Sequence, residues 1–174
     1  GDWFLSDEEI FDEFMVLDIN IPVFRVYNID SGIGYNYIQR AIDNASADDE
    51  IILSAGEFNE NIVIDKPLTL SGSGTNTIIT VQPPFGMGSP PLLDWTLAGI
   101  NVTAEDVTIS NLAISNFTTG ILTYEADSLA LQYVSIKHIQ GIGLHIRESE
   151  DVNVHEMIVA YSELSNIIVE NNST

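Results

Sequence analysis

Apolar and polar residues alternate in short segments along most of this chain, and from Gly99 onward the segments repeat. Gly99-Ile-Asn-Val102 is followed by Gly120-Ile-Leu-Thr123, by Gly141-Ile-Gly-Leu144 and, less closely, by Asn166-Ile-Ile-Val169. Corresponding segments recur about every 21 to 25 residues. A period of this length, built from two-residue alternation and polar turns, predicts a solenoid of short strands.

Two more alternating segments follow each full copy, and the second begins five positions after the first. The first set comprises Val107-x-Ile109, Leu129-x-Leu131 and Val152-x-Val154, and the second set begins at Leu112, Val134 and Met157. We therefore predict three parallel strands per coil. Their inward aliphatic residues are expected to stack about 4.8 Å apart along three inner walls.

The first half of the chain predicts helices before the solenoid begins. A capping-box pattern, Ser6-Asp-Glu-Glu9, followed by helical spacing predicts a helix over residues 7–15, and a second helix is expected over 34–44. Strands are expected over 51–53, 62–64, 68–70 and 78–81. We divide the chain into an N-terminal helix and extended arm (1–33), acting as a cap or assembly segment, and a solenoid domain (34–174). The solenoid domain carries an insertion loop at about 82–98.

Three stretches of this first half carry a family resemblance: Ile38-Gln-Arg-Ala-Ile42, Asp49-Glu-Ile-Ile-Leu53, and the residues from Gly56 to Gly72. They resemble the N-terminal part of right-handed parallel β-helix proteins, which include pectate lyases, polygalacturonases, pectin methylesterases and surface or periplasmic proteins with NosD-like repeats. The resemblance covers roughly residues 34–170. It implies an all-β parallel β-helix whose first coil is capped by the helix over 34–44. It leaves the activity open, because this architecture carries enzymes, adhesins and structural proteins.

Charge and composition exclude several classes of function. The chain has 26 acidic residues against five Lys and Arg and a net charge of −21, so it lacks the cationic surface that nucleic acid requires. No apolar run is long enough to insert into a membrane. Cysteine is absent, which excludes disulfides and thiol chemistry. The chain begins with Gly1-Asp2-Trp3, and we favour a processed secretory product over an expression remnant.

Five asparagines match the acceptor pattern for N-glycosylation. They are Asn44, Asn101, Asn116, Asn171 and Asn172. These motifs support an extracellular or cell-surface location for the protein.

The turn after the first strand of each coil is rich in acidic residues. The acids are Glu105, Asp106, Glu125, Asp127, Glu148, Glu150 and Asp151. Stacked coils would align them along one edge, where several carboxylate oxygens form a candidate Ca²⁺ site. The alternative is a solvated acidic edge that resists aggregation.

Catalytic candidates are few. Pectate-lyase-like elimination, which the resemblance suggests, uses Ca²⁺ on carboxylates and an arginine or lysine base. Arg147 is the one base near the acidic edge. The alternative role of Arg147 is a salt bridge that reduces the repulsion between the carboxylates of this edge. By alternation, His145 and His155 point outward on different walls and His138 lies near a turn, so a metal site formed by the histidines is not expected.

These observations lead to two main hypotheses about function, beside a third in which the chain is a carrier or accessory module of the NosD-like kind. The leading one is an extracellular structural protein, not an enzyme, that self-assembles through its solenoid ends and N-terminal arm into a cell-surface sheath, layer or filament. It requires no cofactor other than the candidate Ca²⁺. The alternative is a carbohydrate-binding or polysaccharide-cleaving β-helix module of the lyase or hydrolase type, with carbohydrate as its partner.

Overall fold

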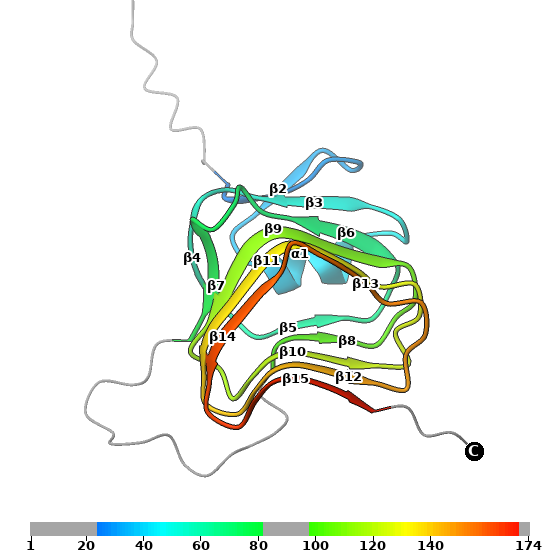
Figure 1. Cartoon of the computed structure of the whole chain (residues 1–174). Coiled ribbons are helices and arrows are strands. Elements are labelled where there is room, and N and C mark those ends of the chain that lie inside the picture. Colours follow the sequence, from blue (N-terminus) through cyan, green and yellow to red (C-terminus); the bar gives the residue numbers. More distant parts are fainter. Residues whose placement is uncertain (1–23, 82–97, 171–174) are drawn as a thin grey trace, which may run out of the picture.

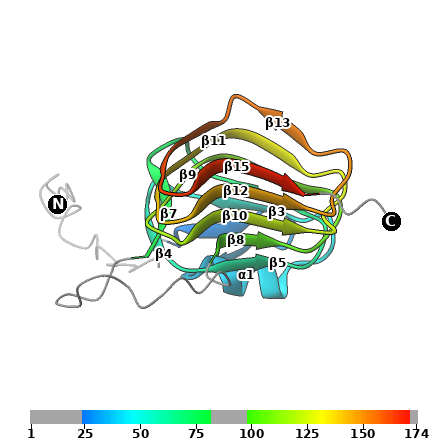
Figure 2. The same cartoon turned by 60° about the horizontal axis from the view of Figure 1, so that its bottom comes forward.

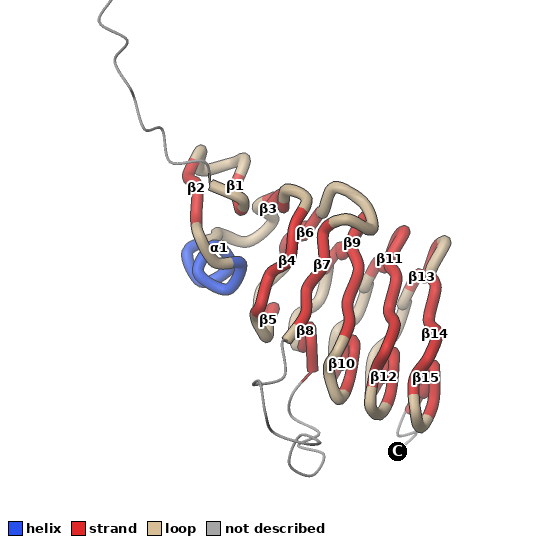
Figure 3. The backbone as a smooth tube through the Cα atoms, turned by 90° about the vertical axis from the view of Figure 1, so that its left-hand side faces the viewer, coloured by secondary structure: helices blue, strands red, loops and turns tan. Residues whose placement is uncertain are grey.

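In the computed structural model, the chain winds into five coils of parallel strands (Figure 1). The structure describes residues 24–81 and 98–170. The coils lie side by side along one axis, and each contains three strand segments (Figure 3). The strands of the coils, in chain order, are β3 (Glu50–Leu53), β4 (Gly56–Asn59), β5 (Ile62–Ile64), β6 (Leu68–Ser71), β7 (Thr77–Thr80), β8 (Ala98–Val102), β9 (Val107–Ser115), β10 (Thr119–Tyr124), β11 (Ala130–Ile139), β12 (Ile142–Arg147), β13 (Asn153–His155), β14 (Ile158–Ser162) and β15 (Ser165–Glu170). The predicted solenoid with three strand segments per coil is thereby confirmed.

The strands form two hydrogen-bonded sheets. The five-stranded sheet, which we call sheet B, has the order β15-β12-β10-β8-β5 and lies across one side of the solenoid (Figure 2). The ten-stranded sheet, sheet A, covers the two remaining sides, because β9 and β11 each bend at a corner and pair with different strands on either side of it. Sheet B therefore presents one flat outer face of its own.

The register of sheet B differs from the repeat read in the sequence. Ile121 pairs with Ile100 on one side and with Leu144 on the other, and Leu144 pairs with Ile167. Gly120 is thereby aligned with Gly143, whereas the sequence pattern had matched it with Gly141. The coil from Ile121 to Leu144 is two residues longer than the coil from Ile100 to Ile121, with one extra residue between the paired positions of β10 and β11 and one between those of β11 and β12. Two-residue alternation cannot detect this difference, because a shift of two keeps the same side inward.

Residues with a left-handed backbone form the corners of the coils. Asn111, Tyr133 and Glu156 occupy one corner in three consecutive coils, with φ of 55°, 55° and 47°. A second corner holds Asn116, His138 and Tyr161 with φ between 55° and 65°. Asparagine tolerates this conformation, whereas it is unfavourable for tyrosine. The corners thus repeat a backbone conformation even where the side chain is poorly suited to it.

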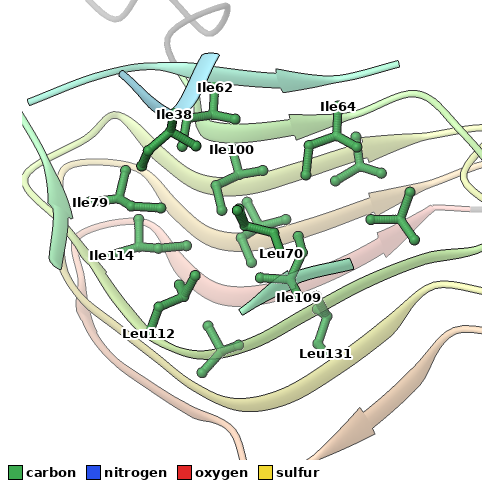
Figure 4. Packing of buried hydrophobic residues seen from close by; sticks show 14 of the residues in the cluster. Ile38, Ile62, Ile64, Leu70, Ile79, Ile100, Ile109, Leu112, Ile114 and Leu131 are labelled. Carbon is green, nitrogen blue, oxygen red and sulfur yellow. The ribbon is translucent and has the colours of Figure 1, made fainter. Parts of the chain in front are cut away.

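The interior is a continuous aliphatic core. Ile109 is fully buried and lies in register between Leu70 and Leu131, and Ile114 lies between Ile79 and Ile136 (Figure 4). The predicted inner walls are confirmed by this packing. Burying one such side chain contributes roughly 1.5–3 kcal/mol, so the columns supply much of the stability of the fold.

Helix α1 (Ile38–Asn44) covers the first coil at the N-terminal end of the solenoid (Figure 3). Its buried residues, Ile38, Ala41 and Ile42, join the core of the coils. The carboxylate of Glu60 accepts hydrogen bonds from the N–H groups of Ile38 and Gln39, at 3.0 and 3.1 Å, and so satisfies two free donors at the start of the helix. The ammonium of Lys66 donates to the Ile42 carbonyl at the other end. The predicted capping role of this helix is confirmed.

The helix is shorter than predicted because its expected first residues belong to a strand. β1 (Val26–Asn28) pairs with β2 (Ile33–Tyr35) in antiparallel fashion and also with β3. Pairing with β1 in this hairpin outweighs the helical spacing of the segment. The hairpin crosses the expected domain boundary at residue 33 and extends sheet A.

Asp49 connects this hairpin to the first coil. Its Oδ2 accepts hydrogen bonds from the buried Asn28 side chain at 2.7 Å and from the N–H of Ser46 at 2.9 Å. The hydrogen bond from Asn28, then that from Ser46, and a smaller attraction to Lys66 hold the pKa of Asp49 below its ordinary value of 3.8 despite some desolvation.

The lowered pKa of Asp49 predicts a pH dependence of stability. A carboxyl whose pKa is lower in the folded than in the unfolded protein stabilises the fold above its unfolded pKa, about 3.9, and this contribution is lost as the pH falls through the lower folded value. We expect Asp49→Asn to be less stable than the parent protein at neutral pH, with the difference shrinking below about pH 4. Urea unfolding from pH 7 to 2 measures this, with the exposed Asp65→Asn as the control. A difference that does not change with pH would contradict it.

Two of the elements predicted from the sequence lie outside the described residues. These are the helix over 7–15 and most of the insertion at about 82–98. Within the described ranges, no helix is long and apolar enough to cross a membrane.

Candidate functional site

The outer face of sheet B collects the polar side chains that come closest to a site. Alternation along β10, β12 and β15 directs every second side chain outward, and the register places the outward residues of the three strands next to each other. One row contains Leu122, His145 and Ile168, and the next contains Tyr124, Arg147 and Glu170. The two rows are two residues apart along the strands, so their side chains meet on one surface.

Four of these side chains form a connected group, which we call the sheet B cluster: Tyr124, His145, Arg147 and Glu170. Nε2 of His145 lies 3.1 Å from Oε2 of Glu170, and Nε of Arg147 lies 3.6 Å from the same oxygen. The Arg147 guanidinium carbon is 5.7 Å from the centre of the Tyr124 ring. His145 is the most enclosed member, with 17% of its side chain exposed, whereas Glu170 is 56% exposed. The cluster thus combines a proton-transfer group, a carboxylate, a cation and an aromatic ring.

Acidic residues of the adjacent turn surround Tyr124. Its pKa is raised above the ordinary value of 10.0, first by the charge of Glu125 and then by the charge of Glu148, with hydrogen bonds to both carboxylates adding to the effect. A phenol next to carboxylates resists losing its proton, because a phenolate would add another negative charge. Tyr124 is therefore a hydrogen-bond donor in the neutral range, and the electrostatic potential at this end of the cluster is negative.

The chemistry of the cluster suits a ligand rich in hydroxyl groups. Histidine hydrogen-bonded to a carboxylate is a common proton-transfer arrangement. Arginine supplies several fixed N–H donors, and an exposed aromatic ring supplies an apolar surface with a polar tip. Since the face is open and its side chains come from three consecutive coils, it matches an extended ligand that lies across the strands.

Arg147 is the one residue of the sheet B cluster that the sequence predicted as a catalytic candidate, in the role of a base near the acidic edge. The structure pairs Arg147 with Glu170, so the salt bridge offered as its alternative role is present. Sequence reasoning placed His145 correctly on the outside but did not connect it with Glu170 or Tyr124. The signal was available in the spacing, because Tyr124, Arg147 and Glu170 occupy equivalent positions of successive coils.

The turns that carry the acidic residues do stack as predicted. The N–H of Asp106 donates to the Asp127 carbonyl at 3.0 Å, and the N–H of Glu150 donates to Oδ1 of Asp127 at 2.7 Å. The predicted Ca²⁺ ligands were Glu105, Asp106, Glu125, Asp127, Glu148, Glu150 and Asp151. Among the described residues, no three histidine or acidic side chains are arranged so that they could hold a metal ion. Calcium binding by this acidic edge stays a prediction.

The asparagines proposed for glycosylation lie in different settings. Asn44 is exposed, and its Nδ2 donates to the Arg40 carbonyl. Asn116 is exposed at a corner, and its Nδ2 donates to Oγ1 of Thr80 at 3.0 Å. On β8, Asn101 has a buried Oδ1 without a hydrogen-bond partner. Asn171 and Asn172 lie outside the described residues. Glycosylation and an extracellular location stay predictions.

The histidines do not converge on one another, in agreement with the sequence analysis. His145 lies on sheet B, whereas His155 lies on β13 of sheet A and makes an edge contact with Tyr133 at 5.5 Å. His138 lies at a corner and stacks on Tyr161 at 5.4 Å.

Comparison with known proteins finds a similar fold among solved structures. No protein-family model and no curated protein sequence matches the chain. The chain is similar to a solved structure of a pectin methylesterase mutant in complex with a hexasaccharide, with a TM-score of 0.52 and 19% sequence identity. The similarity covers 72% of this chain and 46% of that one, so this chain spans about half the length of its relative. The fold is a right-handed parallel β-helix. The resemblance predicted from residues 34–170 is thereby confirmed for the fold.

The comparison also corrects one prediction. The expectation that this β-helix is not an enzyme is contradicted, because the similar structure is that of an enzyme. The expectation rested on the small number of catalytic candidates that the sequence offered. That reasoning overlooked side chains such as His145 and Glu170, which are far apart in the sequence and come together only when the coils stack.

Proposed function

We propose that this β-helix is a carbohydrate-active module that binds a polysaccharide across the outer face of sheet B and cleaves it there. The observation that carries the proposal is the convergence of His145, Arg147, Glu170 and Tyr124 from three consecutive coils on one open face. The complex of the structurally similar pectin methylesterase with a hexasaccharide supports it, because it shows that this fold accommodates an oligosaccharide in that protein.

The shape of the face favours a polymer over a small metabolite. Small-molecule sites are usually concave and enclose most of the ligand. Tyr124 is 39% exposed and the Arg147 side chain 43% exposed, so each can contact a chain that extends beyond the cluster. Repeated short contacts along a stacked surface are the usual way in which solenoids bind extended partners.

The roles of the side chains follow from their chemistry. His145, oriented by Glu170, is the candidate acid–base group, because imidazole transfers protons near neutral pH. Arg147 is the candidate for binding sugar hydroxyl or carbonyl oxygens through its N–H groups. Tyr124 offers its ring to the ligand, and its phenolic oxygen can accept a hydrogen bond, because its O–H is directed to the acidic residues of the turn.

Substitution of His145 and Arg147 tests the proposal. The parent protein is screened against a panel of neutral and acidic polysaccharides by affinity electrophoresis and by release of reducing ends. We expect Arg147→Ala to weaken binding about 10- to 100-fold, the effect of losing a hydrogen bond to a charged group. His145→Ala is expected to reduce cleavage about 10²- to 10⁴-fold while binding changes much less.

Matched controls exist on the other faces of the same coils. Lys137→Ala removes a cation from β11, and His155→Ala removes an exposed histidine from β13; both lie in sheet A. Both controls are expected to bind and cleave like the parent protein. Failure of the parent protein to bind any polysaccharide of the panel, or equal effects of the sheet A and sheet B substitutions, would refute the proposal.

The self-assembling structural protein stays a prediction beside this proposal. Among the described residues, the observation that motivates it is the exposure of apolar side chains in the last described coil. Val154, Ile167 and Val169 are 44%, 51% and 61% exposed there. These side chains follow the inward columns of the preceding coils.

A further inference from the structure

Negatively charged side chains next to the sheet B cluster affect which polysaccharides can bind to this face. Three acidic residues belong to the cluster or contact it: Glu170 lies against His145 and Arg147, and Glu125 and Glu148 flank Tyr124. Asp127 and Glu150 follow in the same stacked turn, joined by the hydrogen bond between the Glu150 N–H and the Asp127 carboxylate. A ligand that lies across β10, β12 and β15 therefore runs beside a row of carboxylates.

Little positive charge is available to offset them. All five basic side chains are among the described residues, and Arg147 is the one on sheet B. Its guanidinium already faces Glu170. Lys137 lies on β11 in sheet A, and Arg25, Arg40 and Lys66 lie at the capped N-terminal end of the solenoid. The overall charge of −21 adds a long-range repulsion for any polyanion that approaches the face.

We propose that the sheet B face takes polysaccharides that carry no negative charge, and that acidic polysaccharides are excluded from it by the carboxylates of Glu125, Glu148 and Glu170. This inference rests on the proposed function of the same face and adds the class of substrate. Exclusion of the wrong ligand by like charges is a common source of specificity. The raised pKa of Tyr124 is consistent with it, since the same two carboxylates disfavour a negative charge at that position.

Polysaccharide pairs that share a backbone and differ in charge provide the test. Hydroxyethylcellulose is compared with carboxymethylcellulose, and fully methyl-esterified polygalacturonan with polygalacturonate, by affinity electrophoresis in the presence of EDTA to prevent bridging by divalent cations. At ~10 mM salt, where the Debye length is about 30 Å, we expect the neutral member of a bound pair to bind at least about tenfold more tightly. At ~0.5 M salt the difference is expected to shrink to about twofold.

A charge-neutralising variant shows which carboxylates are responsible. Glu125→Gln combined with Glu148→Gln is expected to raise the affinity for the acidic member severalfold at low salt, with a smaller change for the neutral member. Glu50→Gln combined with Glu57→Gln removes the same charge from exposed positions on β3 and β4 in sheet A and serves as the control. It separates the local effect from that of net charge.

The outcomes distinguish this inference from the proposed function. Tighter binding of the acidic member at low salt, lost in Arg147→Ala, would overturn the inference and leave the proposed function standing. An equal gain in the test and control variants would also overturn it, because the carboxylates near Tyr124 would then have no special role. Binding of neither member of any pair would overturn both.

Discussion

Replacing Ile109 by aspartate is expected to prevent this β-helix from folding at neutral pH. Ile109 is fully buried at the centre of the columns, in register with Leu70 on one side and Leu131 on the other. A carboxylate at this position loses its hydration without gaining a partner, which costs several kcal/mol or more. This cost is comparable to the whole stability of a typical domain, about 5–15 kcal/mol. In a solenoid, loss of a central coil also deprives both neighbouring coils of their packing surface.

Circular dichroism and urea unfolding measure this effect, and two variants control it. Ile109→Val shortens the same side chain and is expected to cost only about 1 kcal/mol. Thr108→Asp introduces the same carboxylate one residue earlier on β9, at a partly exposed position, and is expected to fold. If Ile109→Asp does not accumulate, Ile109→Ala still tests the prediction, with an expected loss of about 2–5 kcal/mol. A folded Ile109→Asp protein with the parent's unfolding midpoint would contradict it.

Gly120→Ala is expected to give the second-largest loss of stability, about 2–3 kcal/mol or more. Gly99, Gly120 and Gly143 are aligned in three neighbouring strands of sheet B. A Cβ atom on Gly120 would lie less than 3.0 Å from the carbonyl oxygen of Gly143 and from Cγ2 of Ile136. The carbonyl belongs to the backbone of the next coil and cannot move aside without disturbing the hydrogen bonds of sheet B. The requirement for glycine therefore comes from the close approach of neighbouring coils.

Gly74→Ala is the informative comparison for this prediction. Gly74 has a φ of +97°, but a Cβ atom there would meet no other atom within 4 Å. Its substitution is expected to cost about 1 kcal/mol from backbone conformation alone. Thermal unfolding of the two variants separates crowding from conformational strain. A smaller loss for Gly120→Ala than for Gly74→Ala would show that the coils can separate more easily than the packing indicates.

The site shows where sequence reasoning failed and why. The alternation correctly predicted that His145 faces outward, and Arg147, two residues further along β12, lies on the same face. The repeat, however, had aligned Gly120 with Gly141, which pairs Tyr124 with His145 instead of with Arg147. The true register depends on the lengths of the turns before β11 and β12, and a shift of two residues leaves the apolar pattern unchanged. The apolar pattern therefore did not reveal the sheet B cluster, and the signal lay instead in the equal spacing of Tyr124, Arg147 and Glu170.

The N-terminal end shows a different limit. Glu60 and Lys66 hold the two ends of α1, and neither role is visible in local sequence because the partners are more than twenty residues apart. The segment 33–35 has helical spacing but forms β2, since β1 offers it a strand to pair with. Helical propensity is a weak preference, and strand pairing within the hairpin overrides it.

The sequence by itself determined the repeat, the inward aliphatic columns and the negative charge of this protein, because each depends only on the order and type of residues. Two-residue alternation decides which side chains face inward, and a two-residue error in register leaves that set of side chains unchanged. The tertiary structure alone decided which side chains become neighbours across coils. His145 and Glu170 are far apart along the chain, yet lie 3.1 Å apart because the turns set the register that brings β12 and β15 together. The core therefore follows from local periodicity, whereas the candidate site follows from the lengths of the turns.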